Sequence, residues 1–132
     1  MSHLAGQNSS LFSQCVQHIR RWEDRHLPRS KSYIAFDLFI LIGHSATVGE
    51  PMTLKELCNS LKHSERGIRY VLDQFIDGGW CVIVESEQDR RFRHIVATDL
   101  LKTRLREYEQ QVLSAYSALL PSVQNLDAEN VL

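Results

Sequence analysis

The chain has 132 residues, a length that fits one domain with its own hydrophobic core. Its 15 Lys and Arg residues against 16 Asp and Glu residues give a formal net charge of -1, so the bulk charge indicates no polyanionic partner. Hydrophobic residues make up 43% and charged residues 23%, a composition that excludes an intrinsically disordered chain.

The sequence predicts neither a membrane span nor a secretory signal. The most apolar run, residues 33–42, is interrupted by Asp37 and is shorter than the roughly 18 residues that a transmembrane helix needs. Residues 1–10 lack the basic and apolar regions of a signal peptide, so we expect a cytoplasmic protein. The three cysteines include no CxxC pair and predict neither a disulfide framework nor a four-ligand zinc site.

The first predicted helix begins after Ser9 and Ser10, either of which can cap it, and continues to about residue 25. Its apolar residues recur with a period of 3.6 and form one stripe. The stripe consists of Leu11, Phe12, Cys15, Val16, Ile19 and Trp22. Polar and basic residues occupy the opposite face, so this helix is expected to bury one side only.

The second predicted helix covers residues 33–44, with Ser32 as its N-cap. It is apolar almost all round, which places it in the middle of the core. Gly43, Gly49 and Pro51 predict the loop that follows it.

Two helices joined by a tight turn come next. Thr53 and Glu56 have the S/T-x-x-E spacing of a capping box, which predicts a helix over residues 54–62. Ser64 is the predicted N-cap of a helix over residues 65–77, which a Gly-Gly pair ends. The inward face of this second helix consists of Ile68, Val71, Leu72, Phe75 and Ile76.

After these helices the apolar period changes from 3.6 to two. Residues 80–84 are predicted to form a strand, residues 85–89 a polar turn and residues 92–97 the returning strand of a β-hairpin with a charged tip.

Thr98 caps a last predicted helix, which Pro121 ends. Its apolar residues are separated alternately by four and three positions, a spacing that keeps one seam toward a partner helix. The seam consists of Leu101, Leu105, Tyr108, Val112, Ala115 and Leu119. Residues 122–132 show little pattern and are expected to fray.

This order of elements is that of a winged helix-turn-helix, a mainly α fold with a small β-hairpin wing. In such folds the helix after the tight turn enters the major groove, and the wing lies along the DNA backbone. The outward residues of helix 65–77 are of the types that bind base edges and phosphates. With the cap residue they are Ser64, Arg66, Arg69, Tyr70 and Gln74. An ordinary polar helix face is the alternative, and Gly67 is expected to allow a close approach to a backbone.

The hairpin resembles the wing of the multiple antibiotic resistance regulator (MarR) family, which carries Asp-x-Arg, five residues and then Leu-Thr. Here the chain has Asp89-Arg90-Arg91, the five residues 92–96 and then Ala97-Thr98, with Ala in place of Leu. Residues 72–80 also resemble the end of the family's recognition helix and the start of its first wing strand. The resemblance covers about residues 32–120.

In that family, the wing Arg that matches Arg91 reaches into the minor groove and the Asp that matches Asp89 orients it. A narrow minor groove concentrates negative potential, which favours an inserted guanidinium. Arg90 and Arg93 are then expected to contact phosphates or the groove. The alternative is a solvated hairpin whose charges protect an exposed strand edge.

The resemblance also implies a homodimer built from the terminal helices, about residues 10–25 and 99–120. Between them we expect a DNA-binding core of residues 32–98 with its wing at 80–97, all within one winged-helix domain of residues 1–132. A two-fold dimer requires a pseudopalindromic DNA site. The residues expected to dimerise are Phe12, Ile19, Leu101, Leu105, Tyr108, Val112 and Leu119.

Two ways of sensing a signal stay open. Many family members bind small aromatic acids between the dimerisation and DNA-binding parts, and others oxidise a cysteine near the N-terminus, which points to a small-molecule effector or to redox sensing at Cys15. However, Cys15 lies on the apolar stripe without an activating motif. Cys15 and His18 have the spacing of two metal ligands, but no third ligand stands at a matching position, so we expect no metal and no cofactor.

Local charge is the main argument against DNA binding. Residues 54–103 contain eight basic and eight acidic residues, so DNA binding requires that the charges segregate by face. The sequence has no Gly-rich phosphate loop, nucleophile elbow or HExxH motif, and we expect no enzyme. We therefore predict a homodimeric transcriptional regulator that binds double-stranded DNA sequence-specifically. The alternative is a winged-helix module that binds a protein partner without direct DNA contact.

Overall fold

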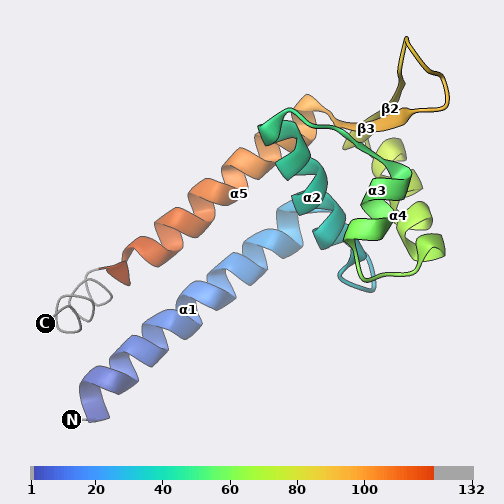
Figure 1. Cartoon of the computed structure of the whole chain (residues 1–132). Coiled ribbons are helices and arrows are strands. Elements are labelled where there is room, and N and C mark those ends of the chain that lie inside the picture. The colour runs from blue at the N-terminus through green and yellow to red at the C-terminus, as the bar shows by residue number, and fades with distance from the viewer. Residues whose placement is uncertain (1, 121–132) are drawn as a thin grey trace, which may run out of the picture. The chain divides into compact units, whose positions relative to one another are not determined.

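The computed structural model describes residues 2–120 and the side chains from Ser10 onward. The chain divides into two compact units. Unit 1 joins the N-terminal segment up to His26 to the C-terminal segment that begins at Glu107, and unit 2 comprises residues 27–106 (Figure 1). Among the described residues, no helix combines the length and apolar character that a membrane crossing requires.

Unit 1 consists of helix α1 (Ser2–His26) and the C-terminal part of helix α5 (Asp99–Ser117). Helix α1 begins earlier than predicted, so Ser9 and Ser10 lie inside it and do not cap it. No proline interrupts residues 2–9, and the helix continues through them. Helix α5 ends three residues before the predicted end at residue 120, and the tail of residues 122–132 lies outside the described residues.

The two helices of unit 1 pack antiparallel through a series of contacts. Near one end, the Trp22 ring stacks on Tyr108 with the ring centroids 5.5 Å apart, and the Tyr108 hydroxyl donates to the Glu23 carboxylate at 2.8 Å. Near the other end, the Cys15 thiol donates to the Ala115 carbonyl at 2.9 Å. Tyr108 and Ala115 of the stripe predicted on α5 therefore contact α1 of the same chain.

Unit 2 begins with helix α2 (Ile34–Val48), whose N-cap is Tyr33 and not Ser32. The helix continues four residues past the predicted end and stops at Gly49, which adopts a left-handed φ of 73°. Gly43, predicted to lie at the loop, lies inside the helix. A Cβ atom there would lie 2.7 Å from Leu105 Cδ2, so the glycine lets the Leu105 side chain pack closely against α2. As predicted, α2 is central to the core, with Leu38, Phe39 and Ile42 among its buried residues.

Helices α3 (Leu54–Ser60) and α4 (Glu65–Asp77) form the predicted helix-turn-helix. Thr53 Oγ1 accepts a hydrogen bond from the Glu56 amide at 3.2 Å, and Ser64 Oγ accepts one from the Gly67 amide at 3.1 Å, which confirms both predicted N-caps. The buried face of α4 consists of Ile68, Val71, Leu72 and Phe75, while Ile76 is half-buried.

The sheet has three antiparallel strands in the order β1-β3-β2. Strands β2 (Cys81–Glu85) and β3 (Arg93–Ala97) form the predicted hairpin, with Ile83 opposite Ile95. Strand β1 (Met52–Thr53) was not predicted, because two residues are too short to show a period of two. It pairs with the inner strand β3, which leaves β2 with an open edge.

Helix α5 starts at the end of β3, where Thr98 Oγ1 accepts from the Leu101 amide at 3.4 Å. In the described part of the chain, five helices and a small antiparallel sheet in this order form a winged helix-turn-helix, which confirms the predicted fold class.

Candidate nucleic-acid interface

Helix α4 exposes the face that the sequence predicts for base contacts. The buried side chains of α4 pack one face of the helix against the core, so the residues on the opposite face point to solvent. All five predicted positions are exposed: Ser64, Arg66, Arg69, Tyr70 and Gln74. The Tyr70 side chain is 66% exposed although it is large and aromatic, which makes it available to a partner.

Arg69 is paired within its own helix. Its guanidinium bonds to Glu65 Oε1 with Nη2 at 2.8 Å, and both side chains are more than half exposed. Such exposed pairs contribute about 0 to 1 kcal/mol, so a phosphate or a guanine edge can displace the carboxylate. Arg66 is exposed and has no ion pair among the described residues.

Gly67 is half-buried and lies against α2, so its small size has a role inside the chain, while a close approach of a nucleic-acid backbone stays a prediction. A Cβ atom at this position would lie 2.9 Å from Ile34 Cδ1 and 3.0 Å from Ser64 Oγ. The glycine therefore permits close packing of α4 against α2.

The wing tip holds the predicted pair of Asp89 and Arg91. The Asp89 carboxylate accepts from the backbone amide of Arg91 at 3.0 Å, from its Nε at 3.1 Å and from its Nη2 at 3.1 Å. These bonds, the side-chain ones first, lower the pKa of Asp89 below its ordinary value and keep it charged at neutral pH. The Arg91 side chain is still 89% exposed, so the aspartate orients an arginine that can reach a partner.

The other two wing arginines differ from each other. Arg93 bonds across the hairpin to Glu85 Oε1 at 3.1 Å, a pair that also links strands β3 and β2. Arg90 is exposed and forms no ion pair among the residues that the structure describes.

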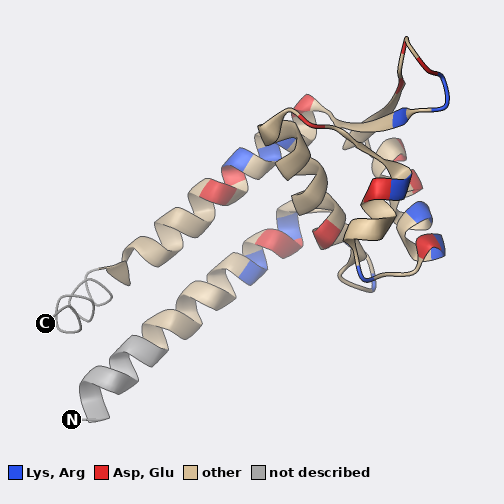
Figure 2. Cartoon of the chain, in the orientation of Figure 1, with Lys and Arg blue, Asp and Glu red and all other residues tan. Residues whose placement is uncertain are grey.

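The charges of unit 2 are interleaved. Figure 2 shows Lys and Arg segments on α3, on α4 and near the wing tip, with Asp and Glu segments beside them. Glu65, Glu85 and Asp89 account for part of this pattern because each pairs with an arginine. The positive charge available to a polyanion is therefore local, and we expect sequence-independent DNA binding to be weak.

The residues predicted to dimerise occupy two kinds of position. Leu101 is fully buried in unit 2, Leu105 packs beside Gly43, and Ile19 and Tyr108 contribute to packing within the chain. In contrast, Phe12 is 55% exposed. The remaining two, Val112 and Leu119, are half-buried. Their role in a dimer stays a prediction.

Cys15 is buried, and its thiol donates to a main-chain carbonyl. The His18 ring bonds to the Gln111 side chain at 3.2 Å. Within the described part of the chain, no three His, Cys, Asp or Glu side chains come together as metal ligands. The redox role of Cys15 stays a prediction, and its burial weakens it because an oxidant must reach the sulfur.

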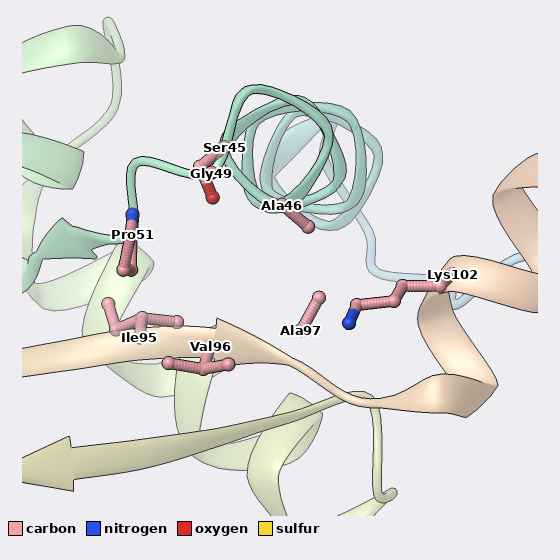
Figure 3. Close-up of a pocket in the computed structure, with 8 residues that line it drawn as sticks. All are labelled: Ser45, Ala46, Gly49, Pro51, Ile95, Val96, Ala97 and Lys102. Carbon is pink, nitrogen blue, oxygen red and sulfur yellow. The ribbon is translucent and has the colours of Figure 1, made fainter.

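The structure contains a pocket that the sequence did not reveal. It has a volume of about 160 Å³ and lies between the C-terminal end of α2, strand β3 and the start of α5. Its walls include Pro51, Ile95 and Ala97, and Figure 3 shows the Lys102 amine pointing toward them. Residues from three separate segments form it, so no local sequence pattern could have identified it.

No family model and no curated protein sequence matches the chain. Solved structures do match. MepR, a transcription regulator of the Staphylococcus aureus multidrug efflux pump MepA, has 11% identity and a TM-score of 0.65 over 99% of this chain and 90% of that chain. The transcriptional repressor CouR of Rhodococcus jostii RHA1, solved on a 23-mer DNA duplex, has 17% identity and a TM-score of 0.59 over 96% and 83%. A MarR transcriptional regulator from Methanosarcina mazei Go1 has 16% identity and a TM-score of 0.54 over 99% and 91%. The chain therefore has the fold of MarR-family regulators, as the wing motif predicted.

Proposed function

We propose that this chain is a transcriptional regulator that binds a specific double-stranded DNA site as a homodimer. Helix α4 enters the major groove, and the wing arginines reach the minor groove. The observation that carries the proposal is the wing tip, where Asp89 orients a highly exposed Arg91 by three hydrogen bonds. An arginine fixed in this way loses little conformational freedom when it enters a groove.

Helix α4 supplies the second element of the proposal. Its exposed Arg66, Arg69 and Gln74 can form bidentate hydrogen bonds to guanine and adenine edges. Phosphate contacts would position the helix, and these side chains would select the sequence. The likeness to CouR, which is solved on a DNA duplex, supports this arrangement.

The proposal includes a small-molecule effector. CouR is solved both on DNA and with p-coumaroyl-CoA, so this fold accommodates both kinds of ligand in that protein. In this chain, the pocket beside Lys102 is a candidate site within unit 2. Its volume of about 160 Å³ limits an occupant to a small molecule.

The experiment is fluorescence anisotropy with the DNA upstream of the protein's own gene and with a scrambled duplex, over a salt series. We expect tight binding to the upstream duplex that weakens as salt rises. The double variant Arg90→Ala/Arg91→Ala should lose about 10-fold to 100-fold in affinity, because loss of one groove contact costs about 1 to 3 kcal/mol.

Arg20→Ala/Arg21→Ala is the matched control, because it removes the same charge from exposed positions on α1. It should retain the wild-type affinity. If neither duplex binds at low salt, or if both double variants lose the same affinity, the DNA-binding proposal is wrong.

One observation favours the alternative of a protein-binding module. The side chains of Val82, Ile83 and Val84 on the edge strand β2 are 45%, 42% and 48% exposed. An apolar strand with an open edge can pair with a strand of another protein. The regulator proposal assigns no DNA contact to these side chains, so it predicts that Val82→Thr/Val84→Thr leaves DNA affinity unchanged.

A further inference from the structure

Two contacts fasten the beginning of α4 to α2. His63, in the turn between α3 and α4, places its Nε2 atom 2.7 Å from Oδ2 of Asp37 in the first turn of α2. Three residues earlier on α2, Ile34 packs against Gly67 of α4. Residues three apart on a helix share one face, so both contacts come from the same side of α2.

These contacts flank the N-cap of α4. Ser64, which caps the helix through the Gly67 amide, directly follows His63. Contacts on both sides of the N-cap therefore fix the first turn of α4. Before the cap, His63 forms an ion pair or charged hydrogen bond with Asp37; after it, Gly67 packs closely against Ile34. The His63 side chain is only 22% exposed and Asp37 38%, so solvent screens this pair less than the more exposed pairs of Arg69 with Glu65 and Arg93 with Glu85.

We propose that His63 and Asp37 are positioning residues for DNA recognition, which set the direction in which the first turn of α4 enters the major groove. The inference rests on the proposed function of α4. Hydrogen bonds to base edges require a side chain to be placed within fractions of an ångström, whereas phosphate contacts tolerate a small rotation of the helix. Loss of the pair should therefore weaken specific binding more than non-specific binding.

The test measures the ratio of affinities for the specific and the scrambled duplex. Asp37→Ala and His63→Ala should each lower affinity for the specific duplex about 10-fold. Affinity for the scrambled duplex and its dependence on salt should change less than about twofold, because the phosphate contacts persist.

The pair should also behave as one unit. The double variant Asp37→Ala/His63→Ala should lose no more affinity than either single variant, since each already removes the interaction. His63→Gln should retain more specific affinity than His63→Ala, because its amide group can still donate to Asp37.

Ile42→Val serves as the stability control, because it removes a buried methylene from α2 without changing the pair. It should lower Tm and leave the affinity ratio unchanged. If the variants of the pair do the same, the pair has only a structural role and the inference is wrong. If His63→Ala loses specificity and Asp37→Ala does not, His63 acts without Asp37 and the inference is also wrong. Absence of wild-type binding to both duplexes would overturn the proposed function itself, and this inference with it.

Discussion

Units 1 and 2 differ in how much apolar surface they bury. Among the described side chains, unit 1 buries only Cys15 and Ile19, whereas unit 2 buries fourteen apolar residues. Unit 1 is held together instead by ring stacking and by hydrogen bonds such as that between Tyr108 and Glu23. At the same time it exposes Phe12 and Leu113 by 55% and 71%.

The difference indicates that unit 2 contains the stabilising core of the chain. Two packed helices with so small a buried core have little stability of their own, because burial must offset the entropy of ordering the chain. If the chain dimerises as proposed, the exposed apolar side chains of unit 1 are a surface that the second copy can cover. Substitutions in the core of unit 2 and on the exposed surface of unit 1 should therefore have different effects.

The largest effect should come from the core of unit 2. Phe39 on α2 is fully buried and meets the Trp80 ring edge-on at 6.0 Å. Phe39→Ala should lower the free energy of unfolding by about 3 to 5 kcal/mol, because it removes a buried ring and leaves a cavity. Chemical denaturation followed by circular dichroism measures this loss.

Val48→Ala, at a position on the same helix that is 51% exposed, is the control and should change stability by less than about 0.5 kcal/mol. A loss below about 1 kcal/mol for Phe39→Ala would contradict the assignment of the main core to unit 2.

The next effect should appear in oligomeric state. Leu113→Asp places a charge on the exposed apolar surface of unit 1 and should raise the dimer dissociation constant at least about 100-fold, or about 3 kcal/mol. Sedimentation or light scattering over a concentration series measures the change. Gln110→Asp, at an exposed polar position on the same helix, should leave the dimer intact. A dimer that tolerates Leu113→Asp would show that another surface joins the two copies.

Local sequence signals predicted unit 2 well. The caps at Thr53 and Ser64 and the periodicity between them located α3 and α4, and α4 has the predicted bounds. The Asp89–Arg91 pair was expected from the resemblance of the hairpin to the MarR-family wing motif, whose Asp and Arg lie two positions apart. These features depend on residues at most a few positions apart.

The features that sequence did not predict depend on distant residues. His63 and Asp37 are 26 positions apart, and no local pattern links them. The packing role of Gly67 depends on Ile34, which lies on another helix and is not near it in the sequence. In unit 1, the seam on α5 fits a partner helix of the same chain as well as one of a second copy, because both require the same apolar spacing.

The smallest effect should appear at alkaline pH, where the buried Cys81 and the half-buried Tyr108 test the two units separately. Burial raises the pKa of the Cys81 thiol in unit 2 from 9.0 to about 11. In unit 1, burial and then the nearby Glu23 carboxylate raise the pKa of Tyr108. A raised pKa means that the folded state keeps its proton longer than the unfolded state, so stability is complete below the unfolded pKa and falls as pH rises toward the folded pKa.

For Cys81, the loss should reach about 2 kcal/mol between pH 9 and 11. Cys81→Ala should remove this part of the pH dependence, whatever its effect on stability at pH 7. Tyr108→Phe should instead flatten the decline above pH 10, where an unfolded tyrosine begins to ionise. Unfolding curves from pH 7 to pH 11 for the wild type and both variants measure the slopes. If Cys81→Ala follows the wild-type slope, the thiol ionises without unfolding unit 2, and the core around β2 is more open to water than its burial indicates.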